Sequence, residues 1–329
     1  MPAISGLGAA GTLTGAELVP VVQSGTTVRT TAQLIADLAS GGTAGVFVNG
    51  RLTLVSGDPV PAADQTAKTT IYFTPYKGNL LTLWDGAAWV TAAFTEKSLA
   101  LGTLTAALPY DVFCYLSTGT PALELLAWSS GSARATAVTL QDGRYCKSGD
   151  KTRLYLGTFY TTSTTTTEDS GGGTSSQVGG KRFVWNYYNR VVRELNVIDT
   201  TNSWTYATAT VRQANDASGN KVEMVLGIRE DTVGAIVHGQ MLSSSGTAWG
   251  VVGVGVDSTT TISGPHGAGF NGTGTNSGVC LTGSWQGSLA PGYHSLSWLE
   301  AGSGGVSIFV GDDGGVSPSQ TGLSAVVQG

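Results

Sequence analysis

Hydrophobic and polar residues alternate with a period of two through most of the chain from about residue 45 onward, which predicts β-strands. Gly, Pro and Asp-Gly signals separate the alternating runs, as expected for short strands joined by turns. In the middle of the chain the predicted strands are 46–48, 51–55, 69–74, 79–84, 88–90, 113–116, 123–128 and 153–160. Asp85-Gly86 lies between two of these runs and predicts a hairpin.

The same pattern continues to the last residue. Predicted strands there are 206–212, 222–228, 234–241, 250–256, 281–285, 293–299 and 306–310, with 322–329 as an additional edge strand. Segment 181–195 is the most aromatic and most basic of the chain, and its alternation favours strand over helix. This number of antiparallel strands is typical of a jelly-roll sandwich. We therefore predict an all-β chain with two β-sandwich or jelly-roll-like domains, a middle domain at 45–160 and a C-terminal domain at 181–329.

Residues 1–44 have a different pattern and are predicted to form a small module of their own. A strand-like run at 13–23 ends at Ser24-Gly25, and Thr30 and Thr31 can cap a short helix over 32–39. Three apolar side chains share one face of that helix: Leu34, Ile35 and Leu38. A helix of this length is not stable alone, so the face needs a partner surface. The partner is either the rest of its own domain or another protein or copy of the chain.

Residues 161–180 are predicted to link the two large domains. Their first thirteen positions, 161–173, are mostly Thr, Ser and Gly and include no apolar side chain to bury. Burial therefore cannot offset the entropy lost on ordering such a segment.

Length and charge narrow the class of protein. The chain has 329 residues, which favours more than one domain, and only 12% are charged, against roughly 25% in ordinary globular proteins. The formal net charge is -5, with no run of Lys or Arg, which argues against nucleic acid as a partner. No stretch has the roughly 18 apolar residues of a membrane span, and the first residues do not resemble a signal peptide. We expect no membrane insertion, and synthesis in a cytoplasm.

Residues for catalysis or metal binding follow no recognisable spacing. The three cysteines, Cys114, Cys146 and Cys280, form no C-x-x-C pair, and no nucleophile elbow accompanies the histidines. His294, between Tyr293 and Trp298 in an alternating run, is predicted to be a packed core or interface residue.

Paired carboxylates would suit a glycan-cleaving enzyme. The candidates are Glu230-Asp231, Asp312-Asp313 and Glu300, all beside turn signals, where solvated loop acids are expected. We therefore predict no catalytic residues, no metal site, no cofactor and no enzymatic activity.

Carbohydrate binding needs aromatic faces next to amides and hydroxyls, and one region offers them. Trp249, His266, Phe270 and Asn271 lie in or near the Gly/Ser/Thr-rich stretch 257–280, which is predicted to be an exposed loop. Phe270 is the strongest candidate because no apolar residues flank it, whereas Trp249 and Trp285 adjoin apolar strands and favour core packing. The four residues named first are the predicted receptor-binding site.

Segments in all three parts of the chain resemble those of tailed-bacteriophage appendage proteins. The N-terminal segments 4–7, 13–23 and 30–38 resemble the attachment segments of phage tail fibres and head fibres. The middle segments 72–76, 78–79 and 84–86, together with 183–193, are similar to a domain common in tail proteins. The segment 292–300 resembles the distal jelly-roll domains of such fibres.

The resemblance implies a virion protein, on the tail or alternatively on the capsid surface. It implies a homotrimer whose residues 1–44, with Leu34, Ile35 and Leu38, attach to other virion proteins, and whose distal domain binds a bacterial surface receptor, a glycan or a protein. A tail fibre is the leading prediction, with a capsid head fibre or decoration protein as the main alternative. A glycan-depolymerising tail spike is the weaker alternative, since such spikes are generally longer β-helices with visible repeats.

Overall fold

The computed structural model describes residues 16, 18–23, 26–31, 46–173, 177–243, 246–264, 267–271, 274, 277–303, 307–312 and 320–329. The chain divides into two compact units, Met1–Phe47 and Val48–Gly329. Almost every element is a strand, and within the described ranges the helical content is one 3-10 turn, η1 (Ala214–Asp216). The prediction of an all-β chain is confirmed.

The N-terminal unit contains an antiparallel hairpin of β1 (Leu18–Gln23) and β2 (Thr26–Thr31), with Leu18 opposite Thr31 and Gln23 opposite Thr26. The strand-like run predicted at 13–23 is a strand over Leu18–Gln23, and residues 13–15 and 17 lie outside the described residues. Thr30 and Thr31, predicted as helix caps, are instead the last residues of β2, because β-branched threonines suit a paired strand well. The predicted helix 32–39 lies outside the described residues, and so do Leu34, Ile35 and Leu38.

The first half of the second unit is built on a seven-stranded sheet with two small sheets beside it. The large sheet consists of β11 (Ala133–Arg134), β10 (Thr120–Ser130), β9 (Pro109–Ser117), β14 (Asp150–Tyr160), β13 (Arg144–Lys147) and β12 (Val138–Gln141), with β17 (Val184–Asn186) also pairing β14. The small sheets are β3 (Gly50–Thr53), β5 (Thr70–Pro75) and β8 (Lys97–Ala100), and the hairpin β6 (Leu80–Trp84) and β7 (Trp89–Ala93). This hairpin is the one that Asp85-Gly86 predicts.

The second half contains an eight-stranded and a six-stranded sheet. The eight-stranded sheet consists of β24 (Ala268–Asn271), β23 (Trp249–Val256), β26 (Gly292–Ser303), β21 (Lys221–Leu226), β16 (Gly179–Arg182), β15 (Thr167–Gly172) and β4 (Gln65–Lys68), with β20 (Arg212–Gln213) pairing β26. The six-stranded sheet consists of β18 (Val192–Ile198), β28 (Gly322–Gln328), β22 (Val233–Ser243), β27 (Ser307–Val310) and β19 (Ser203–Thr205), with β25 (Ser277–Gly287) pairing β22. β28 lies between β18 and β22, so the predicted edge strand is an inner one.

Strands from the two predicted domains are exchanged between sheets. β4, from the middle block, pairs with β15 in the eight-stranded sheet, and β17, from the C-terminal block, pairs with β14 in the seven-stranded sheet. The basic and aromatic segment 181–195 thus contributes to three sheets in succession, through β16, β17 and β18. Residues 48–329 accordingly form one compact unit.

The predicted linker 161–180 contains β15 and β16 and lies within the folded unit, so the expectation of a linker there was wrong. Asp169 supplies one physical reason: its carboxylate is buried and accepts hydrogen bonds from Arg182 at 3.2 Å and Arg193 at 2.8 Å. Thr167 adds another, since its hydroxyl donates to the carbonyl of Tyr160 at 2.6 Å. Polar contacts order this segment in place of the apolar burial that its sequence lacks.

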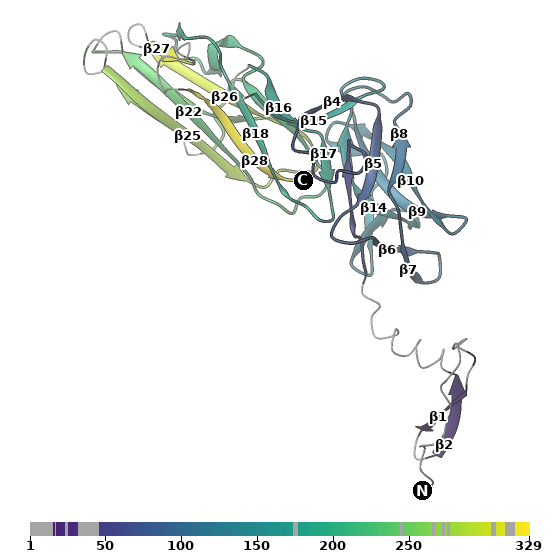
Figure 1. The fold of residues 1–329 in the computed structure, drawn as a ribbon. Helices are drawn as coiled ribbons and strands as arrows, with labels where there is room; N and C mark the ends of the chain where they lie inside the picture. The colour runs from purple at the N-terminus through teal and green to yellow at the C-terminus, as the bar shows by residue number, and fades with distance from the viewer. Residues whose placement is uncertain are drawn as a thin grey trace. The chain divides into compact units, whose positions relative to one another are not determined.

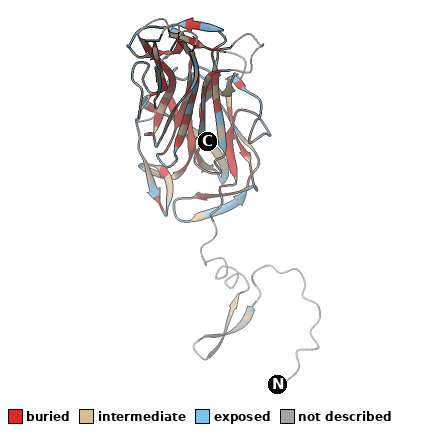
Figure 2. Ribbon diagram, turned by 90° about the vertical axis from the view of Figure 1, so that its left-hand side faces the viewer, coloured by how far each residue is buried: buried red, intermediate tan, exposed pale blue. Residues whose placement is uncertain are grey.

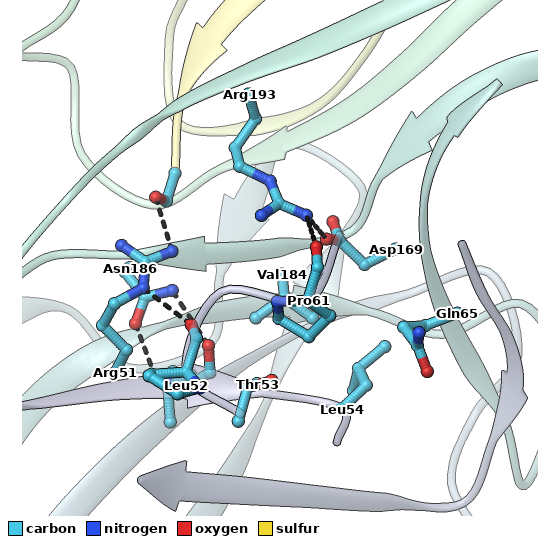
Figure 3. Close-up of a pocket in the computed structure, with 12 residues that line it drawn as sticks. Arg51, Leu52, Thr53, Leu54, Pro61, Gln65, Asp169, Val184, Asn186 and Arg193 are labelled. Atoms are coloured by element: carbon cyan, nitrogen blue, oxygen red, sulfur yellow. Dashed lines mark hydrogen bonds and ion pairs between the residues drawn. The ribbon is translucent and has the colours of Figure 1, made fainter. Parts of the chain in front are cut away.

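A second polar cluster lies beside Asp169 and joins distant segments (Figure 3). The buried Arg51 guanidinium donates to the carbonyls of Pro59 at 3.0 Å and Gly329 at 2.9 Å. The Asn186 side chain accepts from the Leu52 N–H at 2.6 Å and donates to its carbonyl at 3.1 Å. The cavity left at this cluster has a volume of about 10 Å³, room for about one water molecule. This region is therefore occupied by its own side chains.

The second unit has two hydrophobic cores, and Figure 2 shows the buried positions gathered inside the layers of strands. One core fills the space around the seven-stranded sheet and its small neighbours, with Phe73 and Phe159 among its largest buried side chains. The other packs the eight- and six-stranded sheets together and includes Trp298 and Phe309. Trp185, on β17, belongs to this second core, which extends it to the seven-stranded sheet.

Candidate functional site

The structure brings together three of the four predicted receptor-binding residues. Trp249 on β23 is the register partner of Asn271 on β24, and Phe270 is the partner of Gly250. These residues line a shallow hollow of about 220 Å³, to which Gly269 also contributes. We call it the β23–β24 hollow. His266 lies outside the described residues.

Phe270 is half-buried and packs against the core of the C-terminal sheets. The expectation that it has no apolar neighbours was therefore wrong, because its neighbours come from strands that are distant in the sequence. Gly250, the register partner of Phe270, also packs tightly against core side chains. A Cβ at Gly250 would lie 2.0 Å from Met241 Sδ and 3.2 Å from Phe309 Cζ. Much of this hollow's wall is thus part of the packing, and its receptor-binding role stays a prediction.

A larger hollow, of about 730 Å³, lies on the six-stranded sheet. Its lining comes from four strands that run side by side in Figure 1, β18, β28, β22 and β25. The lining residues are Glu194, Asn196, Gly234, Ala235, Ile236, Ser284, Trp285, Gln286, Ser324, Ala325 and Val326. We call it the sheet-face hollow. The sequence prediction did not find it.

Strand alternation builds this surface. On β22 the residues Val233, Ala235 and Val237 are buried in the core, so Gly234 and Ile236 between them face outward. The strand register then places outward residues of neighbouring strands in rows. One row is Glu194, Val326, Gly234 and Gln286, and the next is Asn196, Ser324, Ile236 and Ser284.

Gly234 forms the low point of the first row because it has no side chain. A Cβ placed there would contact only Val326 Cγ2, at 3.8 Å, which is ordinary van der Waals distance. Val326 and Ile236 beside it are apolar and 45% and 43% exposed. The hollow therefore has an apolar floor that is open to solvent.

Trp285 lies behind this floor, because its register partner on β22 is Ala235, which faces the core. It is half-buried and packs against the core of the C-terminal sheets. Two glycines leave room for its ring: a Cβ at Gly287 would lie 2.7 Å from Trp285 Cζ2, and one at Gly264 would lie 3.1 Å from Cδ1. The ring's position is thus fixed by the protein itself. The sequence favours core packing for Trp285, and the structure agrees: the residue packs on the core side of β25.

Five polar side chains surround the floor, those of Glu194, Asn196, Ser284, Gln286 and Ser324. Within the part of the chain that the structure describes, none of the five side chains has a hydrogen bond or ion pair to the protein. Their donors and acceptors are available to a bound molecule. An apolar floor ringed by a few polar groups is the usual composition of a ligand site.

The acids that the sequence analysis weighed for catalysis are engaged elsewhere. Glu300, expected in a solvated loop, lies inside β26 and is fully buried. It accepts hydrogen bonds from Trp204 Nε1 at 2.7 Å and Arg212 Nε at 3.0 Å. Burial raises the pKa of Glu300, and these hydrogen bonds offset that effect only in part.

The remaining acids of that set are placed as follows. Glu230 and Asp231 both pair with Arg190. Asp312 forms an isolated bridge with Gln320, and Asp313 lies outside the described residues. In the described ranges, no three His, Cys, Asp or Glu side chains gather closely enough to hold a metal ion. Among the described residues, no helix has the length and apolar character needed to span a membrane.

His294 is buried, as predicted, and holds the start of the loop that follows β23. Its Nδ1 lies 2.8 Å from Asp257 Oδ2 and its Nε2 lies 2.7 Å from the carbonyl of Ala290. Both partners are acceptors, so the pair of contacts favours the doubly protonated ring. Burial lowers the pKa of His294, but the hydrogen bonds to Asp257 and Ala290 outweigh it and raise the pKa above the ordinary value.

Comparison with known proteins gives no family. No protein-family model matches the chain, and no curated protein matches it. Solved structures with some similarity include a tryptic core variant of Cry1Da from Bacillus thuringiensis, 8% identical over 91% of this chain and 54% of that one, with a TM-score of 0.21. The insecticidal delta-endotoxin Cry8Ea1 from Bacillus thuringiensis is 8% identical over 95% of this chain and 58% of that one, with a TM-score of 0.20. The chain spans little more than half of either structure, and a likeness at this level carries no conclusion about function.

Proposed function

We propose that this chain is a non-enzymatic structural protein of a tailed-bacteriophage virion, a homotrimeric tail fibre that recognises the host surface. In this proposal residues 1–44 attach the chain to other virion proteins, and the sheet-face hollow binds the bacterial receptor. The observation that carries the binding role is the ring of five unengaged polar side chains around an apolar floor. The virion role rests on the resemblance of the N-terminal, middle and C-terminal segments to phage appendage proteins.

The side chains of the hollow support binding rather than cleavage. Glycoside hydrolysis by paired acids needs two carboxyl groups about 5 to 10 Å apart. The lining of the sheet-face hollow includes one, Glu194. A receptor held there would keep its covalent bonds.

A trimer suits this mode of action. A shallow site that is open to solvent binds weakly, and three linked copies convert weak binding into high avidity. The low charged fraction of the chain, 12%, leaves few like charges to oppose association of identical subunits.

The location on the virion is tested by labelling. Immunogold or cryo-electron microscopy of intact particles is expected to place the chain on the tail. Label on the capsid faces would replace the tail fibre with a head fibre or decoration protein. Deletion of residues 1–44 is expected to leave a folded β protein, because residues 48–329 form a compact unit of their own, and to abolish incorporation into particles. Incorporation of the shortened chain would contradict the attachment role.

The recognition role is tested with purified chain. We expect it to compete with phage particles for adsorption to host cells and to release no reducing sugar from host polysaccharide. Release of sugar would identify a depolymerase. Absence of competition at saturating concentration would contradict host recognition.

A further inference from the structure

We infer that the sheet-face hollow binds an uncharged carbohydrate and rejects anionic glycans, with Glu194 as the residue that discriminates. This inference rests on the proposed role of the hollow in host recognition. It is carried by three features of the lining: its charge, its place on the face of the sheet, and the pairing of apolar side chains with free amides and hydroxyls.

The charge of the lining is negative and uncompensated. Glu194 is the one charged residue among the lining residues, which include no Lys or Arg. The two nearest arginines in the sequence are already engaged, since Arg193 donates to Asp169 and Arg190 pairs with Glu230 and Asp231. A uronate, sialate or phosphate group in the hollow would therefore face a carboxylate without a neutralising cation. Repulsion between like charges at close range disfavours such a ligand.

The position on the face of the sheet argues for a sugar rather than an extended peptide. Peptides that add to a sheet pair with the free backbone groups of an edge strand. β28 and β22 in the floor are paired on both sides, so their backbone groups are already used. A ligand on this face has to bond with side chains, and it needs many hydroxyl or amide groups of its own. Carbohydrates have this property.

The arrangement of the lining also suits sugar rings. The side chains of Asn196, Ser284, Gln286 and Ser324 offer both donors and acceptors, which is what hydroxyl groups require. Ile236 and Val326 offer exposed apolar surface for the C–H faces of a ring. The row from Glu194 to Gln286 crosses three strand spacings of about 4.8 Å, about 14 Å in all. The volume of about 730 Å³ lies within the range of roughly 300 to 1,000 Å³ for small-molecule sites.

The test compares two immobilised oligosaccharides of equal length, one of neutral hexoses and N-acetylhexosamines and one in which a uronic acid replaces one unit. Binding of the full-length chain is measured to both, for the wild type and for Glu194→Gln. Asp216→Asn is the matched control, since Asp216 is exposed and lies outside the hollow. We expect the wild type to prefer the neutral chain by at least tenfold. Glu194→Gln should reduce this preference at least fivefold, while Asp216→Asn leaves it unchanged.

A wild type that prefers the uronate chain, or a Glu194→Gln variant with unchanged preference, would overturn the inference. A further variant, Gly234→Leu, fills the hollow and tests host recognition separately from the preference for neutral carbohydrate. If Gly234→Leu abolishes adsorption to host cells but neither oligosaccharide binds, the hollow recognises another kind of receptor, and the inference fails while the proposed function stands. If Gly234→Leu adsorbs normally, the hollow is not the receptor site and both fail.

Discussion

The two hollows of the C-terminal sheets use their side chains differently. In the β23–β24 hollow, Phe270 packs against the core and Gly250 abuts Met241, so the wall is part of the packing. In the sheet-face hollow, the alternation of the strands assigns one set of residues to the core and leaves the other set free. An aromatic residue in a polar stretch therefore does not by itself indicate a binding site. Groups that the fold does not use are better evidence of one.

We expect the largest difference in the free energy of unfolding between alanine substitutions of Gly250, at the β23–β24 hollow, and Gly234, at the sheet-face hollow. Gly250→Ala forces a Cβ to within 2.0 Å of Met241 Sδ, and we expect it to destabilise the unit by about 1 to 3 kcal/mol. Gly234→Ala meets only Val326, at 3.8 Å, and should be neutral or stabilising by up to about 1 kcal/mol, since Gly is unfavourable in strands. Thermal unfolding measures both. Equal losses of Tm in the two variants would contradict the packing described for the two hollows.

The next largest effects are expected from substitutions of the two half-buried aromatic residues, Phe270 and Trp285. Phe270→Ala should destabilise the unit by about 1 to 2 kcal/mol, less than the roughly 3 to 5 kcal/mol of a fully buried ring, and leave host adsorption unchanged. Trp285→Ala should cost a similar stability and also weaken adsorption, by roughly tenfold, because Trp285 anchors the part of β25 that carries Ser284 and Gln286. Chemical denaturation and adsorption assays on the same preparations provide the comparison. Adsorption that depends on Phe270 and not on Trp285 would exchange the roles of the two hollows.

The smallest effect concerns the loop that follows β23 and reaches Trp285 through Gly264. Its first residue, Asp257, pairs with His294, whose pKa is raised in the folded protein. A raised folded pKa stabilises the fold fully below the ordinary pKa of about 6.5, and this stabilisation is lost as pH rises through the folded value. The wild type should exceed His294→Gln in Tm by roughly 2 °C near pH 6. A gap that widens toward pH 9 would contradict the charged pair.

Local patterns predicted strands well where burial alternates along the strand, as in β22 and β28. They failed at segment 161–180, where ion pairs to Asp169 from distant arginines order a chain that has no apolar side chains in its first thirteen positions. They also failed for the exchange of β4 and β17 between sheets, because strand pairing over long separations leaves no local signal.

The predicted binding residues illustrate the same limit. Trp249, Phe270 and Asn271 were grouped correctly because one connection joins β23 to β24. Glu194, Gly234, Ser284 and Ser324 come from four separate strands, and their neighbourhood depends on the order of strands in the sheet. The available signal was the outward position of polar residues within strands 234–241, 281–285 and 322–329.

The central claim, that the sheet-face hollow is the recognition surface, is tested most directly by filling each hollow in turn. Gly234→Leu fills the sheet-face hollow and Gly269→Leu fills the β23–β24 hollow, and at both glycines a Cβ would make only ordinary contacts. Adsorption of the purified variants to host cells is measured beside their Tm. The account predicts at least a tenfold loss for Gly234→Leu and less than a twofold change for Gly269→Leu, with both proteins folded. Loss of adsorption by Gly269→Leu alone would contradict it.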